Sequence, residues 1–152
     1  MRAFDGRLAT KFVTLFLAEF DINGTLIYCN AGHPAALLVR ADGTVIELPT
    51  TGMILGPNPK ATYSIGIDSF EPGDLLVLYT DGITEAVDET DEEYGQERLI
   101  HSVRTVRHQD PIAVVDRVFS DVEEFSATSP PADDQTLVVV KRRASEPEEI
   151  PA

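Results

Sequence analysis

An apolar run that ends abruptly on an acidic residue and a glycine constrains this chain more than any other segment. Residues 75–79 read Leu-Leu-Val-Leu-Tyr, and Thr80, Asp81 and Gly82 follow them. A continuous apolar run of this length is typical of a strand that is buried on both faces. The strand is therefore expected to carry the Asp81 carboxylate to the rim of a sheet.

A second apolar run, residues 137–140, begins directly after the sequence Asp-Asp-Gln-Thr at residues 133–136. Asp81 thus lies where one strand ends, and Asp133 and Asp134 lie where another begins. If the two strands are antiparallel neighbours, all three carboxylates come to the same end of the sheet. Converging carboxylates without evident basic partners are the oxygen ligands that Mg²⁺ and Mn²⁺ prefer.

Length and charge limit the classes of protein that the chain can belong to. Its 152 residues correspond to one ordinary domain with a real core. The net charge of −14 repels phosphate backbones and anionic lipids, so nucleic acids and membranes are not expected partners. Cys29 is the single cysteine, which fits a reducing, cytoplasmic location. We find no apolar stretch of transmembrane length and no signal peptide.

Strand signals dominate the first half of the chain. The first strand has apolar residues on both faces, so we expect it to be covered on two sides. Asn23-Gly24 predicts a hairpin turn, because both residues accept positive φ. Residues 49–60 are rich in Gly and Pro and indicate an ordered loop. The expected strands cover residues 12–20, 26–29, 36–40, 45–48, 63–70, 75–80 and 137–140.

Helical periodicity is confined to the second half. The acidic residues 88–93 indicate a solvated loop. Asp110 and Pro111 then mark the start of a second helix, as N-cap and first helical residue. Strands, then two helices, then one strand predict an α+β protein with helices covering a sheet. The expected apolar stripes are Leu99, Val103 and Val106 on the first helix, and Ile112, Val115, Phe119 and Val122 on the second.

An ordered set of short motifs gives the chain a family resemblance. Over residues 10–142 it resembles the C-terminal portion of the SpoIIE-type serine phosphatases, a bacterial branch of the metal-dependent protein phosphatases related to type 2C. The motifs follow the family's order and spacing, and the set is more specific than any one of them. They are residues 12–16 (Phe-Val-Thr-Leu-Phe), 30–34 (Asn-Ala-Gly-His-Pro), 52–56, 71–74 (Glu-Pro-Gly-Asp), 79–86 (Tyr-Thr-Asp-Gly-Ile-Thr-Glu-Ala), 94–95 and 133–137.

The resemblance implies a fold, a reaction and a set of ligands. The fold is a layered α-β-β-α sandwich of two antiparallel sheets flanked by helices. The reaction is hydrolysis of phosphoserine or phosphothreonine by a water bridged between two Mn²⁺ or Mg²⁺ ions, which needs no protein nucleophile. Asp81 and Asp133 match metal ligands, and Asp134 matches a neighbouring auxiliary position. The implied partner is a phosphorylated regulatory protein, such as an anti-sigma-factor antagonist.

The chain departs from the family pattern in one respect. Relatives carry an upstream Gly-Asp motif that supplies the aspartate bridging both metals, and no matching motif precedes Asp81 here. We therefore expect residues 1–142 to be a partial phosphatase domain without its N-terminal strands, and residues 143–152 to be a disordered tail. Such a chain is expected to bind metal weakly and to hydrolyse phosphoesters slowly or not at all. Open sheet edges further predict a homo-oligomer.

Two other interpretations stay open at this stage. In one, the chain is a non-catalytic module that keeps the fold and binds a phosphoprotein or an intact phosphatase. In the other, it is a structural domain whose aspartates are only turn residues, since an Asp followed by Gly is common in turns. We interpret His33 as a hydrogen-bonding turn residue and Cys29 as a small core residue.

Overall fold

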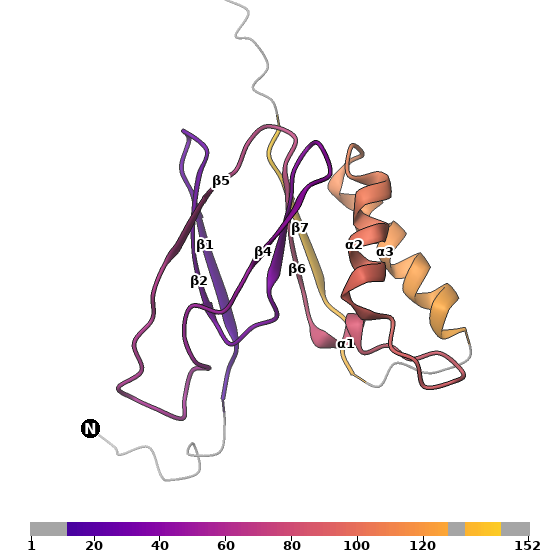
Figure 1. Cartoon of the computed structure of the whole chain (residues 1–152), viewed down its shortest axis with the longest axis horizontal. Helices are drawn as coiled ribbons and strands as arrows, with labels where there is room; N and C mark the ends of the chain where they lie inside the picture. The colour runs from indigo at the N-terminus through magenta and orange to yellow at the C-terminus, as the bar shows by residue number, and fades with distance from the viewer. Residues whose placement is uncertain (1–11, 128–132, 144–152) are drawn as a thin grey trace, which may run out of the picture. The chain divides into compact units, whose positions relative to one another are not determined.

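The computed structural model describes residues 12–127 and 133–143 of the chain (Figure 1). Within them the chain forms two compact units. The first unit comprises residues 12–36 and 47–69, and the second comprises residues 37–46 and 70–143. The strands build two antiparallel sheets, and helices accompany one of them, so the α+β class expected from the sequence is confirmed.

The first unit carries a three-stranded sheet in the order β1-β2-β5. Its strands are β1 (Leu15–Phe20), β2 (Thr25–Ala31) and β5 (Gly66–Ser69), and both pairings are antiparallel. The predicted Asn-Gly turn joins β1 to β2. Gly24 adopts a φ of 88° there, and its N–H donates to the Asp21 carbonyl at 2.9 Å.

Strand β1 does not have the coverage that its sequence predicts. Phe16 is partly buried and stacks on Tyr28 with ring centroids 5.5 Å apart. Leu15 and Leu17, on the opposite face, are 44% and 61% exposed. The prediction of two covered faces is therefore wrong for the described residues. Apolar residues on both faces of a strand predict that both faces are covered, but they do not say which segment covers each face.

The four-stranded sheet lies mainly in the second unit and has the order β4-β3-β6-β7. Strand β6 (Leu75–Tyr79) pairs antiparallel with both β3 (Ala36–Val39) and β7 (Leu137–Lys141), while β4 (Val45–Leu48) forms the far edge. Two helices lie beside this sheet in Figure 1, α2 (Gly95–Val106) and α3 (Pro111–Ser126). One core joins sheet and helices, with Leu37, Val39, Leu75, Val77, Leu99, Val103, Val114 and Val118 fully buried.

The two helices test the predicted apolar stripes. On α2, Leu99 and Val103 are buried and Val106 is partly buried, as predicted. On α3 the buried stripe is Val114, Val118 and Val122, whereas Ile112 is 72% exposed. The predicted stripe of α3 is therefore confirmed at Val122 and wrong at Ile112, while Val115 and Phe119 are only partly buried. Both series have helical spacing, and this helix is apolar over so much of its circumference that periodicity alone cannot choose between them.

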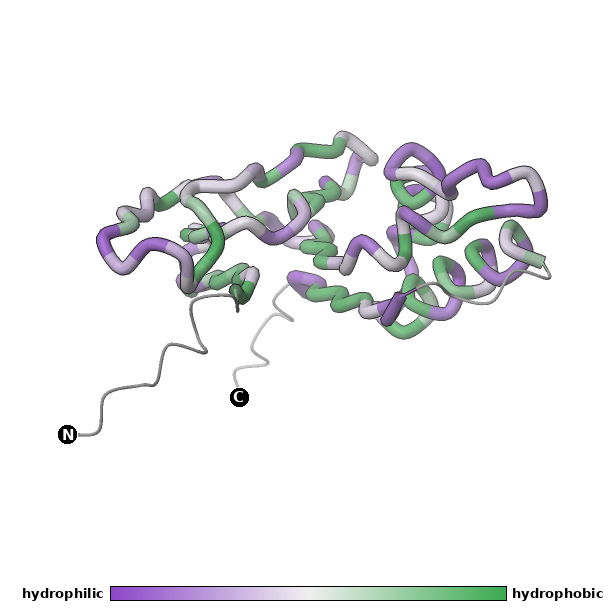
Figure 2. The backbone as a smooth tube through the Cα atoms, turned by 90° about the horizontal axis from the view of Figure 1, so that it is seen from below, coloured by the Kyte–Doolittle hydropathy of each residue, from purple (hydrophilic) through white to green (hydrophobic). Residues whose placement is uncertain are grey.

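Figure 2 shows hydrophobic and hydrophilic residues alternating along the helical segments, as expected for helices that pack one face on a sheet. Helix α3 begins at Pro111 after an extended Asp110, as the sequence predicts, but the Asp110 side chain makes no capping hydrogen bond. In the part of the chain that the structure describes, no helix is both long and apolar enough to cross a membrane.

The acidic residues 88–93 form an exposed loop, as predicted, closed by a bridge between Val87 and Glu93. The Asp88 carboxylate accepts hydrogen bonds from the main-chain N–H groups of Thr90 and Glu92, at 2.7 and 3.0 Å. These bonds favour the charged form and hold the pKa of Asp88 below its usual value. The loop at 128–132 and the expected tail at 144–152 lie outside the described residues.

Candidate metal centre

The candidate centre is built at the end of β6, where the apolar strand gives way to Thr80 and Asp81. Leu75, Leu76 and Val77 are fully or almost fully buried, which anchors the strand in the sheet. The short helix α1 (Asp81–Thr84) starts at once, so the chain turns away at Asp81 and leaves its carboxylate exposed. The aspartate thus lies at the rim, as the sequence predicts.

Strand β7 runs antiparallel to β6, and its first residue, Leu137, pairs with Tyr79, the last residue of β6. The segment that precedes β7 therefore lies beside the segment that follows β6. This register confirms the expectation that Asp81 comes to the same end of the sheet as Asp133 and Asp134.

Beyond the last paired residues of β6 and β7, Thr80 connects the two segments by hydrogen bonds. Its main-chain N–H donates to the Thr136 carbonyl at 3.1 Å, and its Oγ1 accepts the Thr136 N–H at 2.9 Å. The same hydroxyl donates to the Asp134 carbonyl at 3.0 Å. One side chain thus holds the two acidic segments in register. Sequence reasoning missed this role, although the position of a threonine directly before the Asp-Gly pair could have indicated it.

Gly82 brings the segments into direct main-chain contact. A Cβ built on this glycine would lie 2.6 Å from the Asp134 carbonyl oxygen and 3.3 Å from the Asp133 carbonyl carbon. The Gln135 side-chain amide donates to the Gly82 carbonyl at 3.1 Å from the other side. Only a residue without a side chain fits between these groups, so Gly82 sets how close Asp81 comes to the other two aspartates.

The three aspartates are exposed and carry few internal contacts. Asp81 Oδ1 accepts the Gly82 N–H at 3.1 Å, and Asp133 Oδ1 accepts the Asp134 N–H at 2.7 Å. None of the ion pairs found within residues 12–127 and 133–143 involves these carboxylates. Their remaining oxygens are therefore not engaged by a cationic side chain in the described part of the chain.

The oxygen ligands at this edge are of the type that a hard divalent cation binds, but there are few of them. Mg²⁺ and Mn²⁺ prefer carboxylate and water oxygens, which an exposed pair of aspartates at a sheet edge offers. Across the described ranges, however, no three His, Cys, Asp or Glu side chains lie grouped as a metal cluster. Asp81, Asp133 and Asp134 thus share one edge without forming a cage, and their assignment as ligands stays a prediction.

The other candidate residues have structural contacts. The His33 N–H donates to Asn30 Oδ1 at 2.9 Å, and its Nδ1 lies 3.3 Å from Thr14 Oγ1. This geometry agrees with the interpretation of His33 as a turn residue. Cys29 is only partly buried, so it is less of a core residue than predicted, and the Thr51 hydroxyl donates to its Sγ at 3.5 Å.

Comparison with solved structures defines the class of the fold. The phosphatase domain of the cell fate determinant SpoIIE from Bacillus subtilis superposes with a TM-score of 0.70 at 21% sequence identity. The match covers 91% of this chain and 61% of that chain. The two antiparallel sheets with their helices are therefore those of a type 2C-like phosphatase fold.

Comparison of sequences identifies the family. The family model of stage II sporulation protein E (SpoIIE) matches residues 1–143. Protein IcfG of Synechocystis sp. is 33% identical over 132 residues, which are 86% of this chain and 21% of that protein. Phosphoserine phosphatase RsbU of Bacillus subtilis is 27% identical over 139 residues, 89% of this chain and 40% of RsbU. The chain belongs to the SpoIIE family of phosphatases, and it spans less than half the length of these two curated relatives.

Proposed function

We propose that this chain contributes a divalent-cation edge to a protein serine/threonine phosphatase that acts on a phosphorylated regulatory protein. The observation that carries the proposal is the contact between the ends of β6 and β7, where Gly82 packs on the Asp133-Asp134 main chain. Family membership supports the reaction class, and the RsbU relative is itself a phosphoserine phosphatase. The single cysteine supports a cytoplasmic setting.

Asp81 and Asp133 would hold Mn²⁺ or Mg²⁺ in this proposal, with Asp134 as an auxiliary group. When bound, two such ions lower the pKa of a bridging water and neutralise phosphate charge. The carboxylates alone repel a phosphate dianion, so this edge favours substrate only in its cation-loaded form. Thr80 and Gly82 keep the acidic segments in place, and they act through main-chain contacts rather than on the substrate.

The number of ligands favours weak binding by this chain alone. Mg²⁺ keeps several waters and binds tightly only where several anionic groups converge. Since no group of three possible ligands exists among the described residues, we expect weak cation binding and little or no turnover. The same observation favours the second candidate function, a non-catalytic phosphatase-like module that binds a regulatory protein.

Calorimetric titration of Mn²⁺ into the chain, with the Asp81→Asn variant alongside, tests the metal assignment. We expect weak binding that disappears in the variant while the folded circular-dichroism spectrum is retained. Asp116→Asn on α3, at another exposed position, is the matched control and should bind like the parent chain. Equal binding by the parent chain and Asp81→Asn would refute the assigned ligand.

Hydrolysis of a phosphoserine peptide in the presence of Mn²⁺ separates the two candidate functions. Turnover that requires both Mn²⁺ and Asp81 supports the enzyme. Retention of the phosphopeptide without turnover supports the binding module. Robust Mn²⁺-dependent turnover would contradict the expected low activity of this chain.

A further inference from the structure

Half of the chain's twelve Lys and Arg residues gather at one end of the second unit. Three segments meet there: the turn between β3 and β4, the C-terminal end of α2, and the end of β7. Arg104 Nε donates to the Gly43 carbonyl at 2.7 Å, which joins α2 to the turn. Lys141 Nζ donates to the carbonyls of Arg107 and Gln109, at 3.1 and 2.6 Å, which joins β7 to the helix end. We call this group the basic end; its members are Arg40, Arg104, Arg107, Lys141, Arg142 and Arg143.

Three members of the basic end bind neutral acceptors. Arg104 and Lys141 donate to the carbonyls named above, and Arg107 donates to the carbonyls of Ala41 and Arg104, at 3.1 and 2.8 Å. Within residues 12–127 and 133–143 none of the three forms an ion pair. A carbonyl carries no net charge, so these contacts fix the side chains in place without bringing a carboxylate into direct contact with them.

Elsewhere on the second unit, two arginines form ion pairs with carboxylates. Arg98 pairs with Glu92 at 2.5 Å, and Arg117 pairs with Asp121 at 2.8 Å. Both arginines therefore have a carboxylate in direct contact. The positive charge of the basic end is thus concentrated and oriented, while the positive charge elsewhere on the unit is locally balanced.

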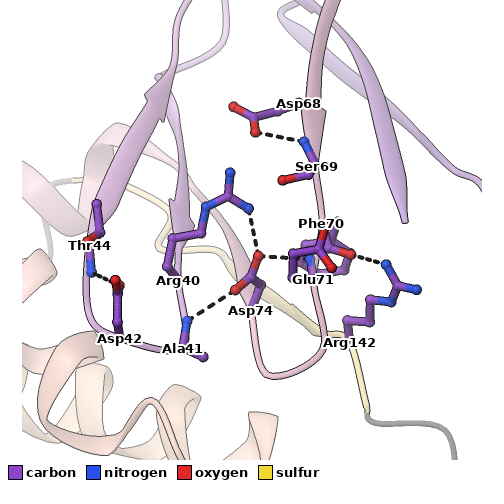
Figure 3. Close-up of polar contacts among 10 residues, drawn as sticks. All are labelled: Arg40, Ala41, Asp42, Thr44, Asp68, Ser69, Phe70, Glu71, Asp74 and Arg142. Carbon is purple, nitrogen blue, oxygen red and sulfur yellow. Dashed lines mark hydrogen bonds and ion pairs between the residues drawn. The ribbon is translucent and has the colours of Figure 1, made fainter. Parts of the chain in front are cut away.

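The carboxylates near the basic end offset part of its charge. Asp74 is 2% exposed and accepts from Arg40 at 2.7 Å, and Figure 3 shows it between Arg40, Ala41 and Glu71, with Arg142 donating to the Phe70 carbonyl. The Asp42 carboxylate accepts from Thr44, which chiefly holds the pKa of Asp42 low, with smaller contributions from Arg107 and Arg40. Within the described residues of the second unit, Glu71 and Asp110 bring the carboxylates of this end to four, against six cations. In that part of the chain this end is net positive, although the whole chain has a net charge of −14.

We propose that the basic end is a docking surface for a short acidic segment of a partner protein. Guanidinium groups recognise carboxylates in a bidentate manner. Arg104 lies in the last turn of α2 and Arg107 is its C-cap residue with helical backbone angles, so the two are three positions apart on the same side of the helix end. A duplex or a membrane is larger than this patch and would meet the negative charge of the surrounding surface, whereas a short acidic segment contacts the patch alone.

The position of the surface separates it from the candidate metal centre. Lys141 ends β7, and Asp133 and Asp134 precede its start, so the full length of that strand lies between the two sites. A partner held at the basic end therefore leaves the acidic edge accessible. The proposal concerns anchoring and does not depend on phosphatase activity.

Fluorescence anisotropy of a labelled oligo-glutamate peptide, titrated with the full chain, tests the proposal. We expect binding at low ionic strength that weakens as salt is raised, because exposed charges are screened. The triple variant Arg104→Gln, Arg107→Gln, Lys141→Gln keeps a donor at each position and removes three charges. It should lower the affinity at least about tenfold.

The matched control is the triple variant Lys60→Gln, Arg98→Gln, Arg117→Gln, which makes the same change in net charge at residues that are not members of the basic end. It should bind the peptide within about twofold of the parent chain. Arg104→Lys with Arg107→Lys keeps the charge but loses the bidentate geometry, so its affinity should lie between those of the parent chain and of the first triple variant. Circular dichroism checks that each variant is folded. If the first triple variant is unfolded, Arg104→Gln alone should still lower the affinity about twofold, whereas Arg117→Gln alone should leave it unchanged.

Three results would overturn the proposal. The first is absence of peptide binding by the parent chain at low ionic strength. The second is equal loss of binding in the test variant and in the matched control. The third is tighter binding to duplex DNA or to phosphatidylserine vesicles than to the peptide, which would assign the surface to a different class of partner.

Discussion

The two sheets of this protein differ in how their apolar side chains are covered. The four-stranded sheet packs β3 and β6 against α2 and α3, and Leu37, Val77, Leu99 and Val103 are fully buried. The three-stranded sheet leaves an apolar face open within the described residues, where Leu17 and Ile67 are 61% and 64% exposed. Both sheets are antiparallel and comparably apolar in sequence, so pattern alone does not distinguish them.

This difference predicts which sheet contributes more to the stability of the fold and which sheet is more prone to associate with another molecule. A sheet that buries its side chains against helices of its own unit gains free energy from each of them. A sheet with an open apolar face gains less, and such faces mark surfaces that associate. Substitutions in the two sheets should therefore have different consequences, which the following experiments measure.

The largest difference in the loss of unfolding free energy is expected between Leu99→Ala and Leu17→Ala. Leu99 is fully buried, and truncating a buried leucine costs about 2–5 kcal/mol through lost burial and the cavity left behind. Leu17 is mostly exposed, so its truncation should cost about 0.5 kcal/mol or less. Urea unfolding followed by circular dichroism gives both free energies. Similar costs would show that the three-stranded sheet is covered in solution.

The next largest difference in the loss of unfolding free energy is expected between substitutions in two turns. Asp74 leads into β6, is almost fully buried, and accepts from Arg40 and from two main-chain N–H groups. Asp74→Asn removes the buried negative charge that accepts from Arg40 at 2.7 Å and should cost about 3 kcal/mol. Asp21 follows β1 in the exposed hairpin turn, and its carboxylate accepts from the Asn23 side-chain amide at 2.9 Å. Asp21→Asn should stay within about 0.5 kcal/mol of the parent chain. The same urea experiment measures both variants, and a small loss for Asp74→Asn would mean that the buried ion pair is not needed for stability.

A smaller effect concerns association. We expect the open face of the three-stranded sheet to make the chain self-associate as concentration rises. Replacing Leu17 by Lys places a charge on that face and should reduce the average mass measured by light scattering. Val138→Lys, at a position in β7 that is 48% exposed, is the control and should change it little. A single monomer species of the parent chain at high concentration would exclude this surface as an association site.

The smallest effect lies at alkaline pH and compares one tyrosine from each unit. Burial raises the pKa of Tyr28, with a further contribution from Asp68, and burial also raises the pKa of Tyr94 despite an opposing hydrogen bond to Ser102. Because each folded-state pKa lies above the unfolded value, the stabilisation is fully present below about pH 10 and is lost as pH rises through the raised pKa. Tyr28→Phe and Tyr94→Phe should each make the fall in stability above about pH 10 less steep. An unchanged pH profile in both variants would contradict burial as the cause.

The sequence predicted the strands that need no tertiary information. Residues 75–79 and 137–140 are apolar at every position, and their acidic ends meet because the strands pair antiparallel, with Tyr79 opposite Leu137. The hairpin at Asn23-Gly24 was also predicted correctly, since local backbone preference decides it.

Other features depend on contacts that a linear pattern does not contain. The buried stripe of α3 includes Val114 and Val118 instead of Ile112, because packing against the neighbouring helix and sheet decides which of the equally spaced apolar residues are buried. Thr80 fastens the acidic segments through bonds to residues more than fifty positions away. For the candidate site, the sequence predicted its place and its residue types, while the role of Asp81 and Asp133 as ligands stays a prediction.

The contact at Gly82 also determines how closely the ends of the two acidic segments approach each other. With no side chain at this position, the end of β6 rests on the Asp134 carbonyl, and any added methyl group would spread the two strand ends. A substitution at Gly82 should therefore move the Asp81 segment away from the Asp133-Asp134 segment while leaving all three carboxylates chemically unchanged.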